Sequence, residues 1–324
     1  MTPTQTVTPG PAGTTALIQR LRANVESVFR GKSHVVDLVI TALVAGGHVL
    51  LEDVPGVGKT TLAQALARSL GADFQRIQFT SDLLPADILG VTIFNKNTAG
   101  FEFRPGPIFA HVILADEINR TSPRTQSALL EAMAERRVSV DDQTYPLPHP
   151  FVVLATQNPM EYHGTYPLPE SQLDRFLVRL SVGYPDAEVE RALLLERRQQ
   201  EPVESLEPVL SLEDLRQVQG AVDQVTLEAS LVDYLLKVVL ASRNSPLIRA
   251  GVSTRGALAL VRATKAHALV QGRDFCVPDD LQTLFIPVLA HRLSLSSLGE
   301  GLPQQRAEAE AVLNDLLTDI PLPL

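Results

Sequence analysis

Residues 53–60 read Asp53-Val54-Pro55-Gly56-Val57-Gly58-Lys59-Thr60, and this stretch decides the fold around it. The apolar run from His48 to Asp53 is typical of a strand buried inside a sheet. After the glycines, leucine and alanine recur at helical spacing as far as Leu70, and Gly71 stands where such a helix ends. The sequence therefore predicts a strand, a tight turn and an amphipathic helix in direct succession.

The turn has the composition of a phosphate-binding loop. Its glycines let backbone N–H groups point inward around phosphate oxygens, and the N-terminus of the next helix adds partial positive charge. In such a loop the Lys59 amine reaches the β- and γ-phosphates and the Thr60 hydroxyl holds Mg²⁺. Asp53 departs from the pattern because glycine is expected there, so the turn must come from Pro55 and Gly56. We assign ATP binding to seven consecutive residues, Pro55, Gly56, Val57, Gly58, Lys59, Thr60 and Thr61.

The rest of the first two-thirds of the chain alternates short apolar runs with helical patterns. Further strands are predicted at Phe74–Phe79, His111–Asp116, Phe151–Thr156 and Arg179–Gly183. Strands that are buried on both faces and separated by helices form a parallel sheet, so the predicted fold class is α/β with helices on each side of the sheet. Two segments, 91–103 and 138–147, read as hairpins that interrupt this alternation.

After about residue 184 the pattern becomes helical. Ser211 with Asp214 resembles a capping box, and Pro278 stands where another helix begins. No strand-type alternation is visible there, so we expect a second, smaller, all-helical domain. The predicted organisation is a disordered tail over residues 1–15, an α/β nucleotide-binding domain over 16–184 and a helical domain over 185–324.

The composition narrows the classes of partner. The chain has 37 acidic and 28 basic residues and a formal net charge of −9, whereas sequence-independent nucleic-acid binding needs a dense basic surface.

The single cysteine, Cys276, cannot form an internal disulfide, which fits a reducing compartment. The N-terminus lacks the pattern of a secretory signal, and the longest apolar stretches are too short or too interrupted to cross a bilayer. We expect a cytoplasmic protein with no membrane span and no nucleic-acid partner.

Polar residues stand at the ends of two predicted strands. Asp116 and Glu117 follow the third strand, where one acid can hold Mg²⁺ through water and the next can polarise an attacking water. Asn158 follows the fourth strand, where an amide could orient that water, although asparagine before proline also fits an ordinary turn. Together these groups predict a nucleotide-hydrolysis site at one edge of the sheet. The local sequence alone decides no role for Arg175 or Arg255.

With these motifs in order, the chain resembles the MoxR family of AAA+ ATPases from about Phe29 to Leu293. Asp53 in the loop looks usual for this family. The similar stretches are Leu51–Thr60, Phe79–Gly90, Ala115–Arg120, Thr125–Met133, Ala155–Pro159 and Leu168–Phe176. The resemblance implies an AAA+ fold, in which a P-loop parallel sheet between helices is followed by a smaller helical lid.

The resemblance also implies roles for the loop and the acids. Gly58, Lys59 and Thr60 would form Walker A, while Asp116 and Glu117 would form Walker B. Thr60 and Asp116 would be the Mg²⁺ ligands, and Glu117 would be the base that activates water.

Three further roles depend on the same resemblance. Asn158 would be sensor 1, and Arg255 in the lid would be sensor 2. Arg175 would be an arginine finger that acts on ATP in the neighbouring subunit, which implies a ring, expected to be a hexamer. The hairpins at 91–103 and 138–147 would project toward partners or a central pore. The resemblance implies a client protein as partner, and a protein with a von Willebrand A domain is the client that we expect.

Several other functions are compatible with a phosphate loop. A magnesium-chelatase-like motor subunit has the same two insertions by resemblance, and an ATP-gated scaffold would signal through its bound state without turnover. A DNA motor fits the acidic composition less well, and a small-molecule kinase would not need Asn158, Arg255 and a helical lid together. The sequence leaves the client and the pathway open.

Overall fold

The computed structural model describes residues 11–159, 164–196, 202–296 and 302–322. At its centre is one five-stranded sheet in the order β2-β5-β8-β1-β9, with every neighbouring pair parallel. This arrangement confirms the predicted parallel sheet. The strands are β1 (Val49–Glu52), β2 (Phe74–Gln78), β5 (Val112–Asp116), β8 (Val152–Gln157) and β9 (Val178–Leu180).

Helices cover both faces of this sheet. Adjacent residues of a strand point to opposite faces, and the apolar side chains on both faces are buried against helices. On one face Leu51 and Leu114 pack in a cluster with the helices before and after the phosphate loop. On the other face Leu50 and Ile113 pack in a separate cluster with α5. The helices concerned are α1 (Pro11–Val28), α2 (Ser33–Val44), α3 (Lys59–Ser69) and α5 (Pro123–Glu135).

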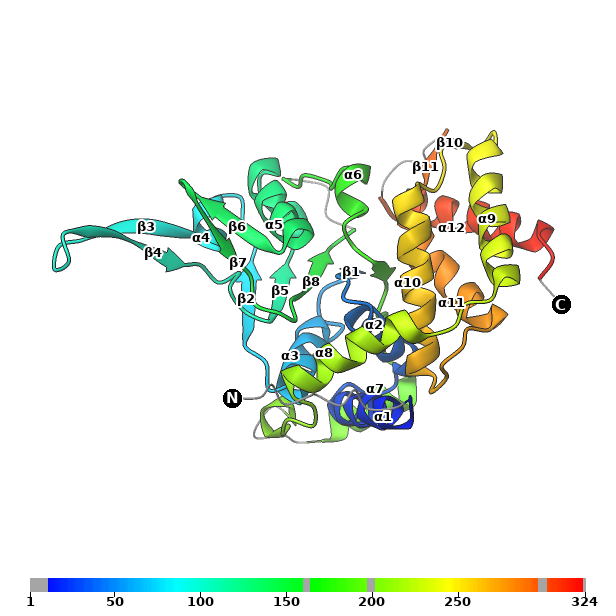
Figure 1. The fold of residues 1–324 in the computed structure, drawn as a ribbon, viewed down its shortest axis with the longest axis horizontal. Helices are drawn as coiled ribbons and strands as arrows, with labels where there is room; N and C mark the ends of the chain where they lie inside the picture. The colour runs from blue at the N-terminus through cyan, green and yellow to red at the C-terminus, as the bar shows by residue number, and fades with distance from the viewer. Residues whose placement is uncertain (1–10, 160–163, 197–201, 297–301, 323–324) are drawn as a thin grey trace, which may run out of the picture.

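Two antiparallel hairpins interrupt the alternation of strands and helices, as predicted. The longer hairpin pairs β3 (Gly90–Asn95) with β4 (Gly100–Pro105) and extends away from the body (Figure 1). At its base a Cβ atom on Gly106 would lie 2.2 Å from the Ile88 carbonyl oxygen, so only glycine allows the strands to close there. The remaining elements on this side are α4 (Pro85–Leu89), η1 (Ile118–Arg120), β6 (Arg137–Val140), β7 (Gln143–Pro146) and α6 (Glu170–Leu173).

The second part of the chain forms the predicted helical lid, with one addition. Ile248–Ala250 (β10) pairs antiparallel with Ser294–Leu295 (β11), and strands of two and three residues are too short to produce visible alternation in the sequence. The predicted capping box at Ser211 and Asp214 is formed. The helices are α7 (Ala187–Leu195), α8 (Leu212–Ala221), α9 (Ala229–Asn244), α10 (Thr254–Val270), α11 (Pro278–Leu289) and α12 (Leu302–Asp319), with short 3-10 turns η2 (Pro202–Ser205), η3 (Val222–Gln224) and η4 (Ala290–Arg292).

The predicted disordered tail is corrected in part. Residues 11–15 belong to α1, which starts at Pro11, while residues 1–10 lie outside the described residues. Thr14 and Ile18 are each 1% exposed, so this helix is packed into the core. Proline is compatible with the first turn of a helix, because no partner exists there for its missing N–H. The Thr, Pro and Gly content of residues 1–15 suggested disorder, but it does not exclude a helix that begins at Pro11.

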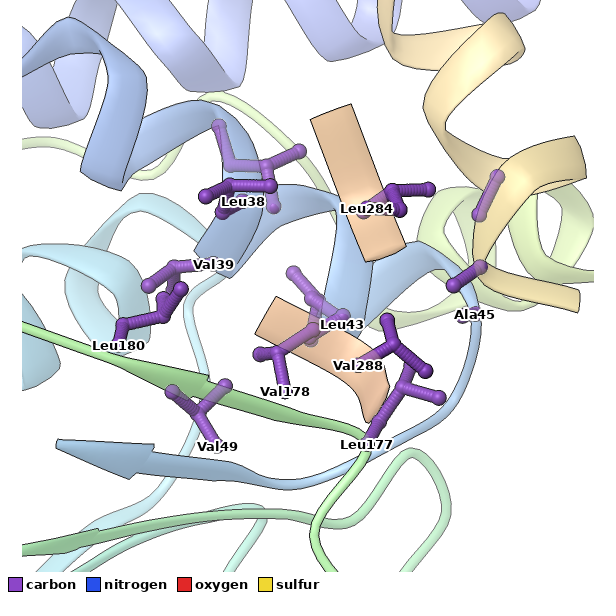
Figure 2. Close-up of a cluster of buried hydrophobic side chains, with 14 of the residues drawn as sticks. Leu38, Val39, Leu43, Ala45, Val49, Leu177, Val178, Leu180, Leu284 and Val288 are labelled. Carbon is purple, nitrogen blue, oxygen red and sulfur yellow. The ribbon is translucent and has the colours of Figure 1, made fainter. Parts of the chain in front are cut away.

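The lid continues the core of the sheet domain. Leu43 of α2, Val178 of β9 and Val288 of α11 lie in one buried cluster (Figure 2). Lid side chains also satisfy carbonyls at the end of α2, since Gln219 donates to the Leu43 carbonyl at 2.7 Å and Arg262 donates to the Ala45 carbonyl at 2.6 Å.

No helix within the described residues has the length and apolar character needed to cross a membrane.

His48 immediately precedes β1 and is buried in one defined tautomer. The Val153 N–H donates to His48 Nδ1 at 3.0 Å, so Nδ1 has no proton and the Nε2–H faces the Met133 carbonyl at 3.3 Å. Burial is the main cause that lowers the pKa of His48 to about 4. Protonation would bring a hydrogen on Nδ1 against the Val153 N–H.

We expect the buried His48 to make the protein acid-sensitive. The unfolded chain takes up this proton below pH 6.5 and the folded chain only near pH 4, so the free energy of unfolding should fall by about 3 kcal/mol between these values. Urea unfolding at several pH values should show that His48→Gln, which keeps a donor and an acceptor, removes this part of the slope. The exposed His34→Gln is the control. An equal slope in His48→Gln and in the wild type would contradict the assignment.

Candidate functional site

The phosphate loop joins β1 to α3 as the sequence predicted. Gly56 and Gly58 have φ values of +87° and +86°, a region that side chains with a Cβ rarely adopt. Gly58 is the N-cap of α3, so the first N–H groups of the helix face the space inside the loop. The result is a concave backbone surface with donors directed inward, which suits an anion.

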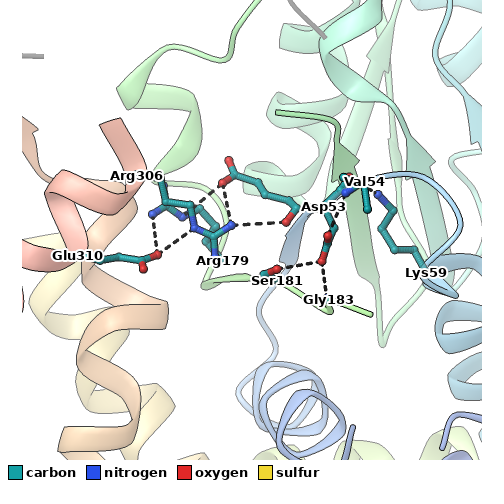
Figure 3. A network of polar contacts seen from close by, with 9 residues as sticks. Asp53, Val54, Lys59, Arg179, Ser181, Gly183, Arg306 and Glu310 are labelled. Atoms are coloured by element: carbon teal, nitrogen blue, oxygen red, sulfur yellow. Dashed lines mark hydrogen bonds and ion pairs between the residues drawn. The ribbon is translucent and has the colours of Figure 1, made fainter. Parts of the chain in front are cut away.

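Asp53, the departure from the general pattern, fastens this loop to the sheet (Figure 3). Its carboxylate accepts hydrogen bonds from Val54 N (2.9 Å), Ser181 Oγ (2.9 Å) and Gly183 N (2.6 Å). Burial opposes ionisation, but hydrogen bonds to the carboxylate outweigh it and hold the pKa of Asp53 below its usual value. The Asp53 carbonyl accepts a hydrogen bond from Lys59 Nζ at 2.8 Å. Asp53 thus connects the loop, its lysine and the segment after β9.

The two acids lie where β5 ends beside β8. Thr156 of β8 joins them, because its hydroxyl donates to Asp116 Oδ1 at 2.6 Å and accepts from the Glu117 N–H at 2.8 Å. Glu117 has φ +58° and ψ +49°, an uncommon left-handed conformation for a residue with a side chain. Its carboxylate accepts a hydrogen bond from Gln78 Nε2 at 2.8 Å and pairs with Arg120 at 3.2 Å.

A cavity of about 370 Å³ brings the predicted groups together. Its walls combine the loop and the start of α3 with groups from the strand ends, namely Pro55, Gly56, Gly58, Lys59, Thr60, Arg76, Gln78, Asp116, Glu117 and Asn158. Arg76 and Gln78 were not predicted. The available signal was the run of polar residues in the second strand, which lies at the sheet edge with Arg76 and Gln78 exposed.

A second cavity of about 320 Å³ lies next to the first and shares Gly56 and Gly58 with it. Val57 and Thr61, the other two residues of the predicted nucleotide-binding set, line this cavity. Apolar side chains of Phe29 and Val203 contribute to its wall. The loop therefore has a polar, charged cavity on one side and a more apolar cavity on the other.

The donor set fits Mg²⁺ held together with phosphates. The Thr60 hydroxyl and the Asp116 carboxylate line the same cavity, and both present the oxygen ligands that Mg²⁺ prefers. Among the described residues there is no group of three or more His, Cys, Asp or Glu that could hold a metal alone. The chain's own ligands therefore suit a cation that takes its other ligands from water and a nucleotide.

The structure does not bring the two arginines to this cavity. The Arg175 guanidinium donates to the Leu130 carbonyl at 2.9 Å and lines another hollow, with Glu131 and Glu135. Arg255 is 76% exposed, and its guanidinium lies 3.7 Å from the Asp174 carboxylate. Within one chain, neither side chain reaches the phosphate loop.

Asp174, next to Arg175, is held by a buried lid arginine. The Arg292 side chain is 3% exposed, and its Nε pairs with Asp174 Oδ1 at 2.8 Å. Arg292 also donates to the Phe176 carbonyl at 2.7 Å and the Leu177 carbonyl at 3.2 Å. The turn that contains Arg175 is therefore fixed to the lid.

Comparison with known proteins defines the class of this chain. Residues 48–178 match the model of the ATPase family associated with various cellular activities (AAA), and residues 240–316 match the AAA lid domain. A crystal structure of a candidate ATPase from Cytophaga hutchinsonii superposes with a TM-score of 0.86, at 35% identity and over 97% of both chains. The protein is thus an AAA+ ATPase in fold, with the α/β domain and helical lid described above.

Within that class the chain belongs to the MoxR family. It is 39% identical over 323 residues to Chaperone MoxR1 of Mycobacterium tuberculosis, a match that covers 97% of this chain and 84% of the relative. It is 33% identical to Protein MoxR of Paracoccus denitrificans over 93% of this chain and 95% of the relative. An uncharacterized protein of Bacillus subtilis, YeaC, is 48% identical over 95% of both chains. The resemblance predicted from the motifs is confirmed.

Loss of the Asp53 carboxylate should loosen the phosphate loop. For Asp53→Ala we expect the free energy of unfolding to fall by about 2 kcal/mol, because three donors lose a charged acceptor. Affinity for ATP should fall roughly tenfold, since the backbone donors are no longer preorganised. Urea unfolding and titration with a fluorescent ATP analogue measure the two effects. The exposed Asp186→Ala, close in sequence to Gly183, is the control, and equal behaviour of both variants would contradict the role of Asp53.

Proposed function

We propose that this protein is a Mg²⁺-dependent ATPase that uses ATP hydrolysis to remodel or activate a partner protein. The observation behind this proposal is the single cavity that combines the phosphate loop with Asp116, Glu117 and Asn158. A phosphate cradle with a neighbouring base is suited to the transfer of a γ-phosphoryl group to water. The homologue named Chaperone MoxR1 supports the link to partner proteins. In line with the sequence expectation, we place this activity in the cytoplasm.

The two adjoining cavities suggest how ATP is held. The triphosphate occupies the polar cavity, where loop N–H groups and Lys59 face its oxygens. The adenine occupies the more apolar cavity beside Val57 and Phe29. Lys59 is suited to this role because the Asp53 carbonyl holds its amine near the loop. Burial is the largest influence on the pKa of Lys59 and lowers it, while Asp53, Asp116 and Glu117 oppose that shift.

The acids and the amide perform the chemical step. Thr60 and Asp116 hold Mg²⁺, which when bound neutralises charge on the β- and γ-phosphates. Glu117 accepts a proton from water as the water oxygen bonds to the γ-phosphorus, and the bond to the β–γ bridging oxygen breaks. Asn158, 6% exposed at the end of β8, orients that water. The products are ADP and inorganic phosphate.

We propose that Arg175 acts on ATP in a neighbouring subunit of a ring, expected to be a hexamer. This role fits its place outside the cavity of its own chain. The family resemblance implies the role of sensor 2 for Arg255. Its exposed side chain also lies outside the phosphate cavity of its own chain. We therefore propose that Arg255, like Arg175, acts on ATP in a neighbouring subunit. Each ATP site is then complete only between two subunits.

The hairpins are the proposed contact with the client. Phe94 and Phe101 form an edge-to-face pair near the end of the β3–β4 hairpin and are 55% and 77% exposed. Exposed aromatic side chains are common at protein interfaces. A client with a von Willebrand A domain stays an expectation from the family, as does contact with a central pore.

The catalytic assignment predicts an ATP trap. Glu117→Gln should bind ATP as the wild type does and hydrolyse it at least a hundredfold more slowly, because an amide cannot accept the proton. Lys59→Ala should instead lose ATP affinity. Equilibrium binding of a fluorescent ATP analogue and release of phosphate measure the two properties. Hydrolysis by Glu117→Gln at the wild-type rate would remove Glu117 as the base, and a wild type that binds but never hydrolyses ATP would favour the ATP-gated scaffold.

Action in trans predicts rescue by mixing two inactive variants. Arg175→Ala should be slower than the wild type by a factor of about 10³ or more, and Glu117→Gln by at least about a hundredfold. A one-to-one mixture should recover about a quarter of wild-type hydrolysis, because one random interface in four pairs an intact Glu117 with an intact Arg175. The double variant mixed with Arg175→Ala is the control and should recover nothing. A mixture as slow as its components would exclude the finger in trans.

A further inference from the structure

Arg76 occupies a position in the phosphate cavity that the proposed mechanism does not use. Its guanidinium donates twice to one oxygen of Asp116, from Nη2 to Oδ2 at 2.6 Å and from Nε to Oδ2 at 3.2 Å. The other oxygen, Oδ1, accepts the Thr156 hydroxyl at 2.6 Å. Asp116 is the carboxylate proposed to hold Mg²⁺, and both of its oxygens therefore accept hydrogen bonds from protein side chains.

The same guanidinium also sets the orientation of Gln78. Arg76 Nη2 donates to Gln78 Oε1 at 3.1 Å, and Gln78 Nε2 donates to Glu117 Oε2 at 2.8 Å. A guanidinium can only donate and a carboxylate can only accept, so the amide between them has one orientation that satisfies both. Arg76 is thus connected to Asp116 directly and to Glu117 through Gln78.

We propose that Arg76 is a positioning residue that competes with the divalent cation for Asp116 and couples cation binding to the release of Glu117. This inference rests on the proposed function. The positively charged Arg76 guanidinium makes both of its hydrogen bonds to Asp116 Oδ2, so a cation approaching that oxygen competes with Arg76 for it. When Arg76 leaves Asp116, Gln78 loses the bond that orients it, and the hold of its amide on Glu117 weakens.

The surroundings of the pair allow this exchange. The Arg76 side chain is 49% exposed and comes from β2 at the sheet edge, so it has room to move into solvent. Asp116 is 14% exposed and remains fixed by Thr156 from the interior of the sheet. In an ordinary surface ion pair both side chains can move, whereas in this pair only the arginine side chain is free to move away.

The test is the cation affinity of the nucleotide complex, measured without turnover. Wild type and variants are saturated with a fluorescent ADP analogue, and Mg²⁺ is titrated while the fluorescence is recorded. Arg76→Ala and the more polar Arg76→Gln should lower the half-saturating Mg²⁺ concentration by about fivefold, because the competitor is absent. Arg76→Lys should lie between these variants and the wild type, since an amine keeps the charge but loses the paired donors.

Arg216→Ala is the matched control, because Arg216 also forms a half-exposed ion pair, with Glu213 at 3.0 Å, away from the cavity. It should leave the Mg²⁺ titration unchanged. An unchanged or raised half-saturation in both Arg76→Ala and Arg76→Gln would overturn the inference while the proposed function stands. A wild type that binds no adenine nucleotide would remove both together.

Discussion

The carboxylate of Asp53 makes the hydrogen bonds on which the geometry of the site depends. It joins the first residue of the phosphate loop to the segment after β9, at the opposite side of β1 from β8. Next to it, Glu52 pairs with Arg179 of β9 at 3.6 Å, and Arg179 pairs with Glu310 of α12 at 3.5 Å (Figure 3). Ion pairs therefore connect the lid to β1 through Arg179, and the hydrogen bonds of Asp53, the residue after Glu52, connect β1 to the loop and to the segment after β9.

The other side of the site depends on strand order. Because β5 lies between β2 and β8, Asp116 has Gln78 as its register partner on one side and receives the Thr156 hydroxyl from the other. β2 then leads through α4 into the projecting β3–β4 hairpin. A client contact at the hairpin would have a short route to Arg76 and Gln78.

The lid has a double role in this arrangement. Arg292, buried against Asp174 and the carbonyls that follow it, fixes the turn from which Arg175 projects. Gln219 and Arg262 hold the end of α2, which packs on the sheet beneath the loop. A change in the lid would therefore reach both the chain's own nucleotide and the arginine proposed for the neighbouring site.

The sequence by itself determined the parallel sheet, the phosphate loop and the acids at Asp116 and Glu117, because hydrophobic period, glycine spacing and strand ends are local properties. It also indicated both hairpins, the helix after the phosphate loop, the helices that begin near Ser211 and Pro278, and the helical character of the second domain. Tertiary structure alone decided what Asp53 and Arg76 do, since their partners lie far away in the chain, at Gly183 and Asp116. It also placed Arg175 and Arg255 outside the cavity of their own chain, because the packing of the lid, and not sequence spacing, positions them.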